Sequence, residues 1–284
     1  MDLRHLNITE QKRLCLPGDS LAADVSCFRV DAPSGSYRCR LEGNPKGEVL
    51  VLCNSLGTDL SMWDFCAPQL LSHFRLLRFD RIGAGTSKHS GGVRIDDLGR
   101  DVCGILDRLS IENVSICGHA FGGLIGLWLG AFESRRIRRL VVSGVAERIG
   151  TPDFWKARID RIRQHGLEST IPSIIERWFS PGFEVSRPRD YLFMMEMLRR
   201  TSEVEYVERC MAISDCDVSA YVSEILVPTL VIGARFDGAC PADASRGLCK
   251  KLANARYIEL AAAHMSPVEC SDAYSYAICD FLSM

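Results

Sequence analysis

A glycine-flanked turn between an apolar run and a helix-like run constrains this chain more than any other feature. Residues 118–123 read G-H-A-F-G-G; the run at 114–117 is apolar, and residues 124–129 resemble the start of a buried helix. Strand, sharp turn and helix form the context in which G-x-S-x-G presents a serine nucleophile. Ala120 stands at the serine position, and its methyl group carries no lone pair. The chain therefore has the frame of a nucleophile elbow without the nucleophile.

Length and charge narrow the classes of function. A chain of 284 residues suffices for one large α/β domain with an insertion. The net charge of −2 predicts no binding to nucleic acid or to an anionic membrane, and no apolar run is long enough to cross a bilayer. Residues 1–25 lack the apolar core of a signal peptide and are predicted to form an appended arm. We expect a cytoplasmic protein whose partner is a small molecule.

The chain contains 13 cysteines, an odd number without paired C-x-x-C spacing. Several lie inside apolar runs, among them Cys53 and Cys117. Disulfide frameworks are typical of short secreted chains, so these cysteines are predicted to be free thiols in a reducing compartment.

Apolar runs alternate with helical patterns along the chain. Strands are predicted at residues 27–30, 37–41, 49–53, 75–80, 114–117, 140–143, 228–233 and 255–260, and a helix at 96–109. Such alternation indicates an α/β fold with a mostly parallel central sheet. The core is predicted to comprise residues 26–146 and 224–284. Between them, residues 147–223 have helical spacing and no clear strand, which predicts a helical cap above the carboxyl ends of the strands.

Two further residues suit a catalytic role beside the turn. Asp237 follows the predicted strand at 228–233, and His264 follows the strand at 255–260. The chain order of nucleophile position, acid and histidine matches one known arrangement of the Ser-His-Asp triad. In a triad the histidine takes the proton of the nucleophile, and the acid orients the imidazole. An ordinary loop histidine and a turn-capping aspartate are the alternative interpretations.

Backbone amides near Ala120 are candidates for an oxyanion hole. In this arrangement one amide comes from the residue after the nucleophile and the other from the loop after an early strand. These positions correspond to Phe121 and Leu56, which would act through their N–H groups. Predicted substrate contacts are Ser55, Arg148, Trp155, Arg177 and Trp178. An arginine can hold a carboxylate through two hydrogen bonds, although a surface arginine and a cap-core tryptophan are the simpler interpretations.

The sequence resembles the α/β-hydrolase superfamily and, within it, the 3-oxoadipate enol-lactonases. The resemblance extends from about residue 28 to the C-terminus, and its specific stretches are residues 53–63, 98–102, 122–126, 147–152 and 176–183. It implies an α/β-hydrolase fold with a helical cap and hydrolysis of a small carboxylated ester or enol-lactone, without metal or organic cofactor. A homodimer formed through the cap or an edge strand is compatible with it. The chain departs from the family in its alanine at position 120, its N-terminal arm and its many cysteines.

Three hypotheses account for Ala120. The first is a hydrolase inactivated by replacing its serine with alanine, which removes one hydroxyl and leaves the site otherwise intact. The second is a natural lyase, decarboxylase or isomerase in which His264 and Asp237 act as a base and the oxyanion hole holds an enolate. The third is a non-catalytic binding protein that retained the pocket.

Overall fold

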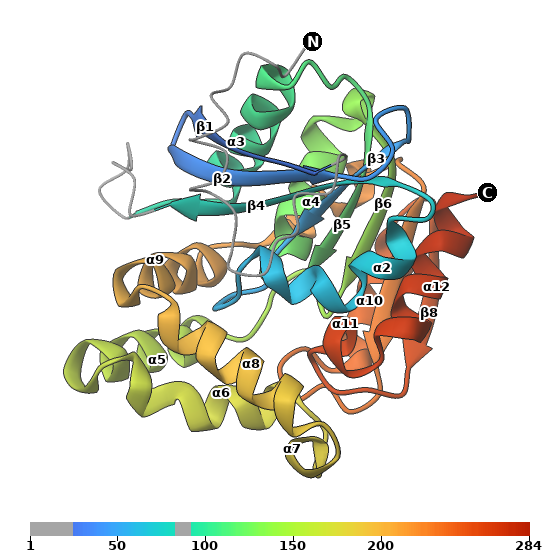
Figure 1. The fold of residues 1–284 in the computed structure, drawn as a ribbon. Helices are drawn as coiled ribbons and strands as arrows, with labels where there is room; N and C mark the ends of the chain where they lie inside the picture. Colours follow the sequence, from blue (N-terminus) through green and yellow to red (C-terminus); the bar gives the residue numbers. More distant parts are fainter. Residues whose placement is uncertain (1–24, 83–91) are drawn as a thin grey trace.

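The computed structural model describes residues 25–82 and 92–284 (Figure 1). Eight strands form one sheet in the order β1-β2-β4-β3-β5-β6-β7-β8. The strands are β1 (Val25–Ala32), β2 (Gly35–Glu42), β3 (Val49–Cys53), β4 (Arg75–Ile82), β5 (Val114–His119), β6 (Ile137–Ser143), β7 (Thr229–Ala234) and β8 (Ala255–Leu260). The predicted α/β fold with a mostly parallel sheet is therefore confirmed.

Strand direction divides the sheet into two parts. β1 pairs with β2 and β2 with β4 in antiparallel fashion, whereas the remaining neighbours run parallel. Every residue of β5 and β7 is buried. Strands covered on both faces need apolar side chains on both, which explains why the central runs in the sequence are continuously hydrophobic rather than alternating.

Among the described residues, the core outside the predicted cap segment contains six α-helices. They are α2 (Ala67–Leu70), α3 (Ile95–Arg108), α4 (Phe121–Phe132), α10 (Ala242–Lys251), α11 (Ser266–Glu269) and α12 (Ser271–Leu282). α4 contacts β5, β6 and α3, while α10 contacts β7 and β8. α4 begins directly after β5, so the last residue of the strand and the first of the helix enclose a single residue, Ala120.

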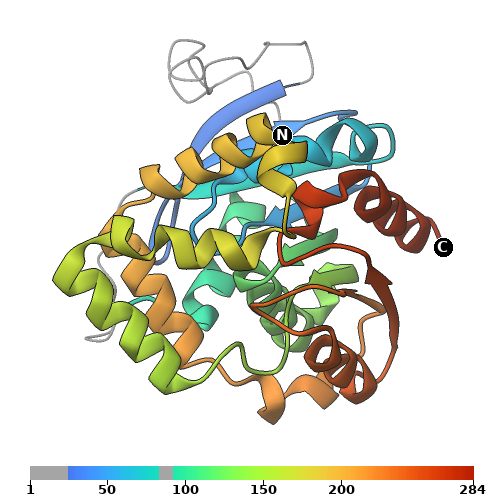
Figure 2. The same cartoon turned by 90° about the horizontal axis from the view of Figure 1, so that it is seen from below.

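The segment predicted as a cap, residues 147–223, contains only helices. They are α5 (Pro152–His165), α6 (Ile171–Trp178), α7 (Phe183–Ser186), α8 (Pro188–Arg200) and α9 (Glu203–Ser214), with short 3-10 turns at Leu167–Thr170 and Val218–Ala220. The helices lie together below the sheet in Figure 1 and in front of the core in Figure 2. We call this segment the cap.

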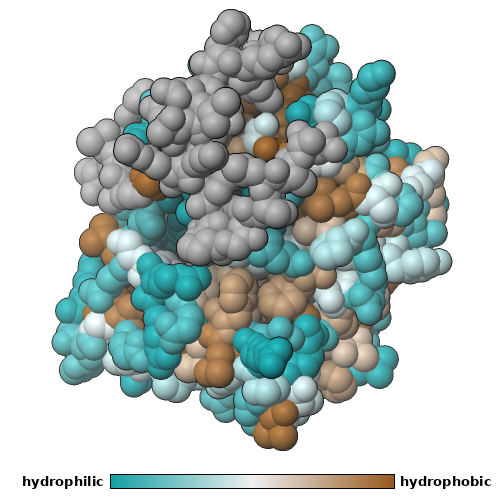
Figure 3. Space-filling model, viewed as in Figure 1, coloured by the Kyte–Doolittle hydropathy of each residue, from teal (hydrophilic) through white to brown (hydrophobic). Residues whose placement is uncertain are grey.

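The start of the cap follows from local chemistry. Thr151 caps α5 by accepting a hydrogen bond from the N–H of Phe154, and Pro152 occupies the first helical position. Proline suits that position because its missing N–H would have no partner inside the helix. α5 buries Trp155, Ile159 and Ile162 along one stripe. Its outer face is polar, and the lower left of Figure 3, where α5 and α9 lie, is mainly hydrophilic.

Three further predictions concern the N-terminal arm, the cysteines and the absence of a membrane span. The arm predicted at residues 1–25 lies outside the described residues except for Val25, which begins β1. All twelve cysteines among the described residues are free thiols, and eight of them are buried. In the described part of the chain, no helix is long and apolar enough to span a membrane.

Candidate active site

Ala120 occupies a strained backbone position at the end of β5. Its φ of 50° and ψ of −108° lie in a region that residues other than glycine rarely adopt. The conformation is held by hydrogen bonds on both sides, because the N–H of Ala120 donates to the Ser143 carbonyl and the Ala120 carbonyl accepts from the N–H of Leu124. The turn therefore retains the geometry that exposes a nucleophile, although the side chain is a methyl group.

The glycines around Ala120 are required by close backbone contacts. A Cβ on Gly118 would lie 2.2 Å from the carbonyl oxygen of Gly122. A Cβ on Gly122 would lie 2.1 Å from the carbonyl oxygen of Cys53, at the end of β3. Both distances are shorter than any real carbon–oxygen contact, so only glycine fits. The G-x-A-x-G pattern thus reflects packing between the turn, α4 and β3.

Asp237 and His264 form a buried pair next to this turn. Asp237 lies in the loop after β7, and His264 in the loop after β8. Nδ1 of His264 is 2.8 Å from Oδ2 of Asp237, and both side chains are almost fully buried. The second oxygen, Oδ1, accepts hydrogen bonds of 2.7 Å from the N–H groups of Ala239 and Cys240. The carboxylate thus fixes the ring of His264 from one side.

These contacts favour an ionised Asp237. Burial alone raises the pKa of its carboxyl group, but the charge of His264 and the hydrogen bonds from His264, Cys240 and Ala239 outweigh it and lower the pKa below its ordinary value. An ionised carboxylate at Nδ1 keeps the proton there, so Nε2 of His264 is left free to accept a proton from a ligand.

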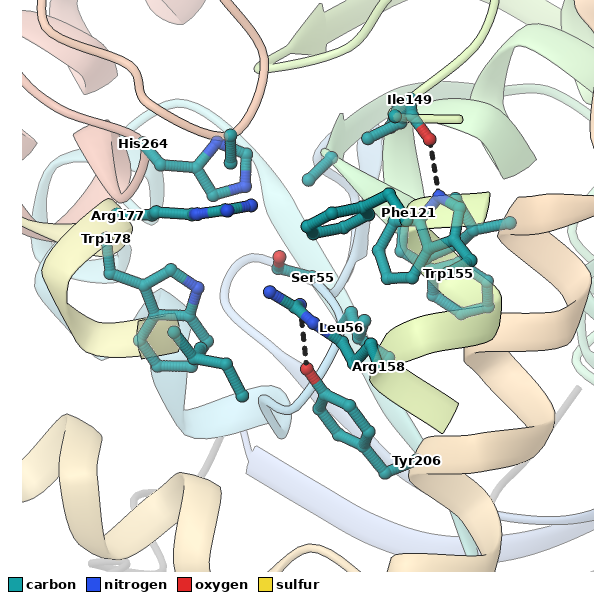
Figure 4. Close-up of a pocket in the computed structure, with 16 residues that line it drawn as sticks. Ser55, Leu56, Phe121, Ile149, Trp155, Arg158, Arg177, Trp178, Tyr206 and His264 are labelled. Atoms are coloured by element: carbon teal, nitrogen blue, oxygen red, sulfur yellow. Dashed lines mark hydrogen bonds between the residues drawn. The ribbon is translucent and has the colours of Figure 1, made fainter. Parts of the chain in front are cut away.

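The two residues whose amides are proposed to form the oxyanion hole line the same cavity. Leu56 and Phe121 both line the cavity beside Ala120 and His264 (Figure 4). Within the described residues, neither backbone N–H has a hydrogen-bond partner. Phe121 is the first residue of α4, where N–H groups have no partner inside the helix. Both donors remain available to a ligand oxygen.

A partly buried polar cluster supports the loop that carries Leu56. The side-chain amide of Asn54 donates to Asp80 and to the Phe79 carbonyl at 2.9 Å, while its oxygen accepts from the indole N–H of Trp63. Asp80 also accepts from the N–H of Leu60 and from Arg38. Burial, followed by the charge of Asp59, raises the pKa of Asp80 to about 6. Sequence reasoning did not identify this support, which joins β4 to the loop after β3.

His119 lies behind the turn rather than in the cavity. Its Nδ1 is 2.8 Å from Oγ of Ser143, which is 2.6 Å from the hydroxyl of Tyr274. Burial, followed by the charge of His264, lowers the pKa of His119 to about 3. His119 is therefore neutral near pH 7, and its ring packs against the ring of His264.

A cavity of about 150 Å³ lies between Ala120 and the cap. It is lined by Ala120, His264 and the two amide positions, and by four of the predicted substrate contacts: Ser55, Trp155, Arg177 and Trp178. Its size suits an organic molecule of a few carbon atoms rather than a polymer. Trp155 is fixed at the wall by a 2.6 Å hydrogen bond from its indole N–H to the Ile149 carbonyl (Figure 4).

Arg148 is the predicted contact that the structure places elsewhere. It does not line the cavity, and its guanidinium donates to Asp217 at 2.5 Å in a half-exposed ion pair. Asp217 itself is held by Ser219, beyond the end of α9. Arg148 precedes α5 and Asp217 follows α9, so this ion pair joins the two ends of the cap.

Arg158 and Tyr206 line the cavity although sequence reasoning did not identify them. Arg158 follows Trp155 by three residues on α5, so the two share one face of the helix, and this spacing was the available signal. Tyr206 comes from α9, which packs against α5. Nothing in the sequence pairs these helices. No group of three or more histidine, cysteine, aspartate or glutamate side chains gathers to hold a metal ion in the described part of the chain.

Comparison with known proteins places this geometry in a family. A sequence family described as "alpha/beta hydrolase fold" matches residues 48–269. 3-Oxoadipate enol-lactonase 2 of Acinetobacter baylyi is 32% identical over 237 residues, covering 83% of this chain and 89% of the relative.

Two solved structures are also similar. The enol-lactonase from Burkholderia xenovorans LB400 has a TM-score of 0.86 and 34% identity, with 90% of this chain and 100% of that chain covered. A hydrolase from Pseudomonas aeruginosa PA01 has a TM-score of 0.84 and 31% identity, with 93% and 100% covered. The family match covers β3 to β8, the cap and the loops that carry Asp237 and His264. The chain belongs to the α/β-hydrolase fold family.

Proposed function

We propose that this chain carries the site of a hydrolase for small carboxylated esters or enol-lactones and that, with alanine at position 120, it holds such a molecule without cleaving it. The observation that carries the proposal is His264, which is bonded to Asp237 and lines the same cavity as Ala120, Leu56 and Phe121. Every group that serves acyl transfer has a counterpart here except the attacking oxygen.

The mechanism assigns each group a step once a hydroxyl stands on residue 120. His264 would accept the hydroxyl proton at Nε2 while the oxygen attacks the ester carbonyl. The N–H groups of Leu56 and Phe121 would donate to the resulting oxyanion, and Asp237 would stabilise the imidazolium. His264 would then return the proton to the leaving oxygen, and water would release the acid by the same route. Alanine has no oxygen to begin this sequence.

Ala120→Ser tests the proposal directly. Serine fits the same strained turn, because it adds one oxygen to the Cβ already present. We expect hydrolysis of a short p-nitrophenyl ester and of a carboxylated enol-lactone to rise by at least about a thousandfold, since loss of a nucleophile costs up to about a millionfold elsewhere. Ala120→Gly is the matched control, because it also fits a positive φ but supplies no hydroxyl. A folded Ala120→Ser protein that remains inactive on both substrates would refute the proposal.

A second candidate function uses the same pair as a base towards carbon. Nδ1 of His264 is engaged by Asp237, and the ring points into the cavity (Figure 4). Nε2 could therefore remove a proton next to a carbonyl, while the two amides hold the enolate oxygen. The test is deuterium exchange of a short keto acid in heavy water, followed by NMR. Exchange that is lost in His264→Ala supports this function, and exchange that His264→Ala leaves unchanged contradicts it.

A further inference from the structure

Two guanidinium groups enter the cavity from different cap helices. Arg158 extends from α5 and Arg177 from α6, and both line the cavity. Figure 4 shows them pointing inward from opposite sides, Arg177 beside His264 and Arg158 beside Ser55. Both side chains are half-buried. An arginine remains ionised at physiological pH, so the cavity carries two positive charges.

The two charges are close enough to influence each other. The guanidinium carbons of Arg158 and Arg177 lie 4.8 Å and 4.7 Å from the centroid of the same ring, that of Phe154. Burial, followed by the charge of Arg158, lowers the pKa of Arg177. Like charges held together in a partly dry site are unfavourable unless an anion offsets them.

Neither charge is paired with a carboxylate in the part of the chain that the structure describes, although the nearby charge of Glu176 partly favours the charged form of Arg177. Among the described residues, neither arginine forms an ion pair, whereas Arg148 and Arg187 pair with Asp217 and Asp190. The carboxylate of Asp237 is already held by His264 and two backbone amides. Arg158 instead donates to the hydroxyl of Tyr206 at 3.4 Å, and that hydroxyl remains able to donate to a ligand.

We propose that the ligand of this cavity is a small organic dianion, with one carboxylate bound by Arg158 and Tyr206 and the other by Arg177. This proposal rests on the proposed function, which identifies the cavity as the ligand site. It applies both to a ligand that is cleaved and to one that is only bound. Arginine suits this task because its planar fork donates two parallel hydrogen bonds to one carboxylate. Between the two forks, the Phe154, Trp155 and Ile174 side chains offer an apolar wall for the carbon chain of the ligand.

Binding to the unaltered Ala120 chain tests the proposal without any need for turnover. Glutarate and adipate are compared with their monoamides by isothermal titration calorimetry at pH 7.5. Each monoamide has the length and shape of its dicarboxylate but only one charge. We expect one of the two dicarboxylates to bind at least about tenfold more tightly than its monoamide, since charge-assisted pairs are the stronger hydrogen bonds.

Variants assign the preference to the two arginines. Arg158→Gln and Arg177→Gln should each reduce the preference for the dicarboxylate to about twofold or less, while Arg158→Lys and Arg177→Lys, which keep the charge, should retain part of it. Arg161→Gln is the matched control, because Arg161 is an exposed residue of the same helix α5 that does not line the cavity. It should leave the preference unchanged. Circular dichroism spectra and melting temperatures show which variants are folded.

Two results would overturn the dianion proposal. Equal affinity for dicarboxylate and monoamide in the unaltered chain would do so and would leave the proposed hydrolase site standing, because one carboxylate suffices for that function. A preference that persists in both folded glutamine variants would also overturn it. Failure of the hydrolase proposal is recognised separately, by a folded but inactive Ala120→Ser protein.

Discussion

The imidazole ring of His119 packs against that of His264, with 5.0 Å between the ring centroids and 44° between the planes. One ring faces the cavity, and the other is sealed behind the turn with its Nδ1 against Ser143. A charge on both rings would be strongly unfavourable at this distance and depth. His119 therefore stays neutral and packs behind His264, and His264 is the ring that can accept a proton from a ligand.

His119 should make the stability of the protein depend on pH. Its pKa is about 3 in the folded protein and 6.5 in the unfolded chain, so between these values the unfolded state binds more protons. The free energy of unfolding should therefore fall as pH drops below 6.5, by about 1.4 kcal/mol per pH unit from this residue alone. Urea unfolding at pH 7.0, 6.0 and 5.0 measures the slope.

His119→Asn should flatten that slope, because asparagine can still bond to Ser143 but does not titrate. The comparison of slopes between the two proteins isolates His119 from the other titrating groups. A variant as sensitive to acid as the unaltered protein would show that His119 contributes nothing to the pH dependence.

Gly118→Ala and Gly122→Ala should each destabilise the fold. The added Cβ would meet a backbone carbonyl oxygen at 2.2 Å and 2.1 Å, and backbone cannot move aside as a flexible side chain does. We expect a loss of about 3 kcal/mol or more, or failure to fold. Gly247→Ala in α10 is the control, because nothing lies within 4 Å of the added Cβ and alanine favours helix by about 0.5–1 kcal/mol. Thermal and urea unfolding give the values.

Asp237→Asn, introduced together with Ala120→Ser, should show how much the Asp237–His264 pair contributes to hydrolysis. Asparagine keeps the size of the side chain but cannot stabilise the imidazolium and favours the wrong tautomer of His264. By analogy with the protease triad, we expect kcat to fall by about 10³–10⁴-fold while KM changes little. The measurement is steady-state hydrolysis of a p-nitrophenyl ester. A fall of less than tenfold in a folded variant would contradict the assignment.

Arg148→Gln should leave ligand affinity unchanged, in contrast to Arg177→Gln. Arg148 is paired with Asp217 outside the cavity, and a half-exposed ion pair contributes about 0–1 kcal/mol to stability. Titration of the two variants with the dicarboxylate that binds the unaltered chain compares them. Weaker binding in Arg148→Gln by more than about threefold would place Arg148 in the binding site after all.

The features that could be predicted from the sequence alone are those set by local chemistry. The turn at Ala120, the buried runs of β3, β5 and β7, and the positions of Asp237 and His264 after two strands could be predicted, because parallel strands bring their carboxyl ends to one edge of a sheet. The helical character of the cap also follows from its spacing. Each of these features depends on residues close together in the chain.

Tertiary packing decided the rest of the candidate site. Arg158 and Tyr206 meet only because α5 and α9 pack together, and Arg148 points away because Asp217 lies within reach of it. Asp80 supports the loop of Leu56 from a neighbouring strand. One arginine among many on amphipathic helices carries no local signal of its partner, since burial and charge pairing depend on how the cap helices are arranged over the sheet. The sequence by itself therefore shows that residue 120 is an alanine without the hydroxyl oxygen of a nucleophile. The tertiary structure decides which charged side chains surround the cavity beside Ala120.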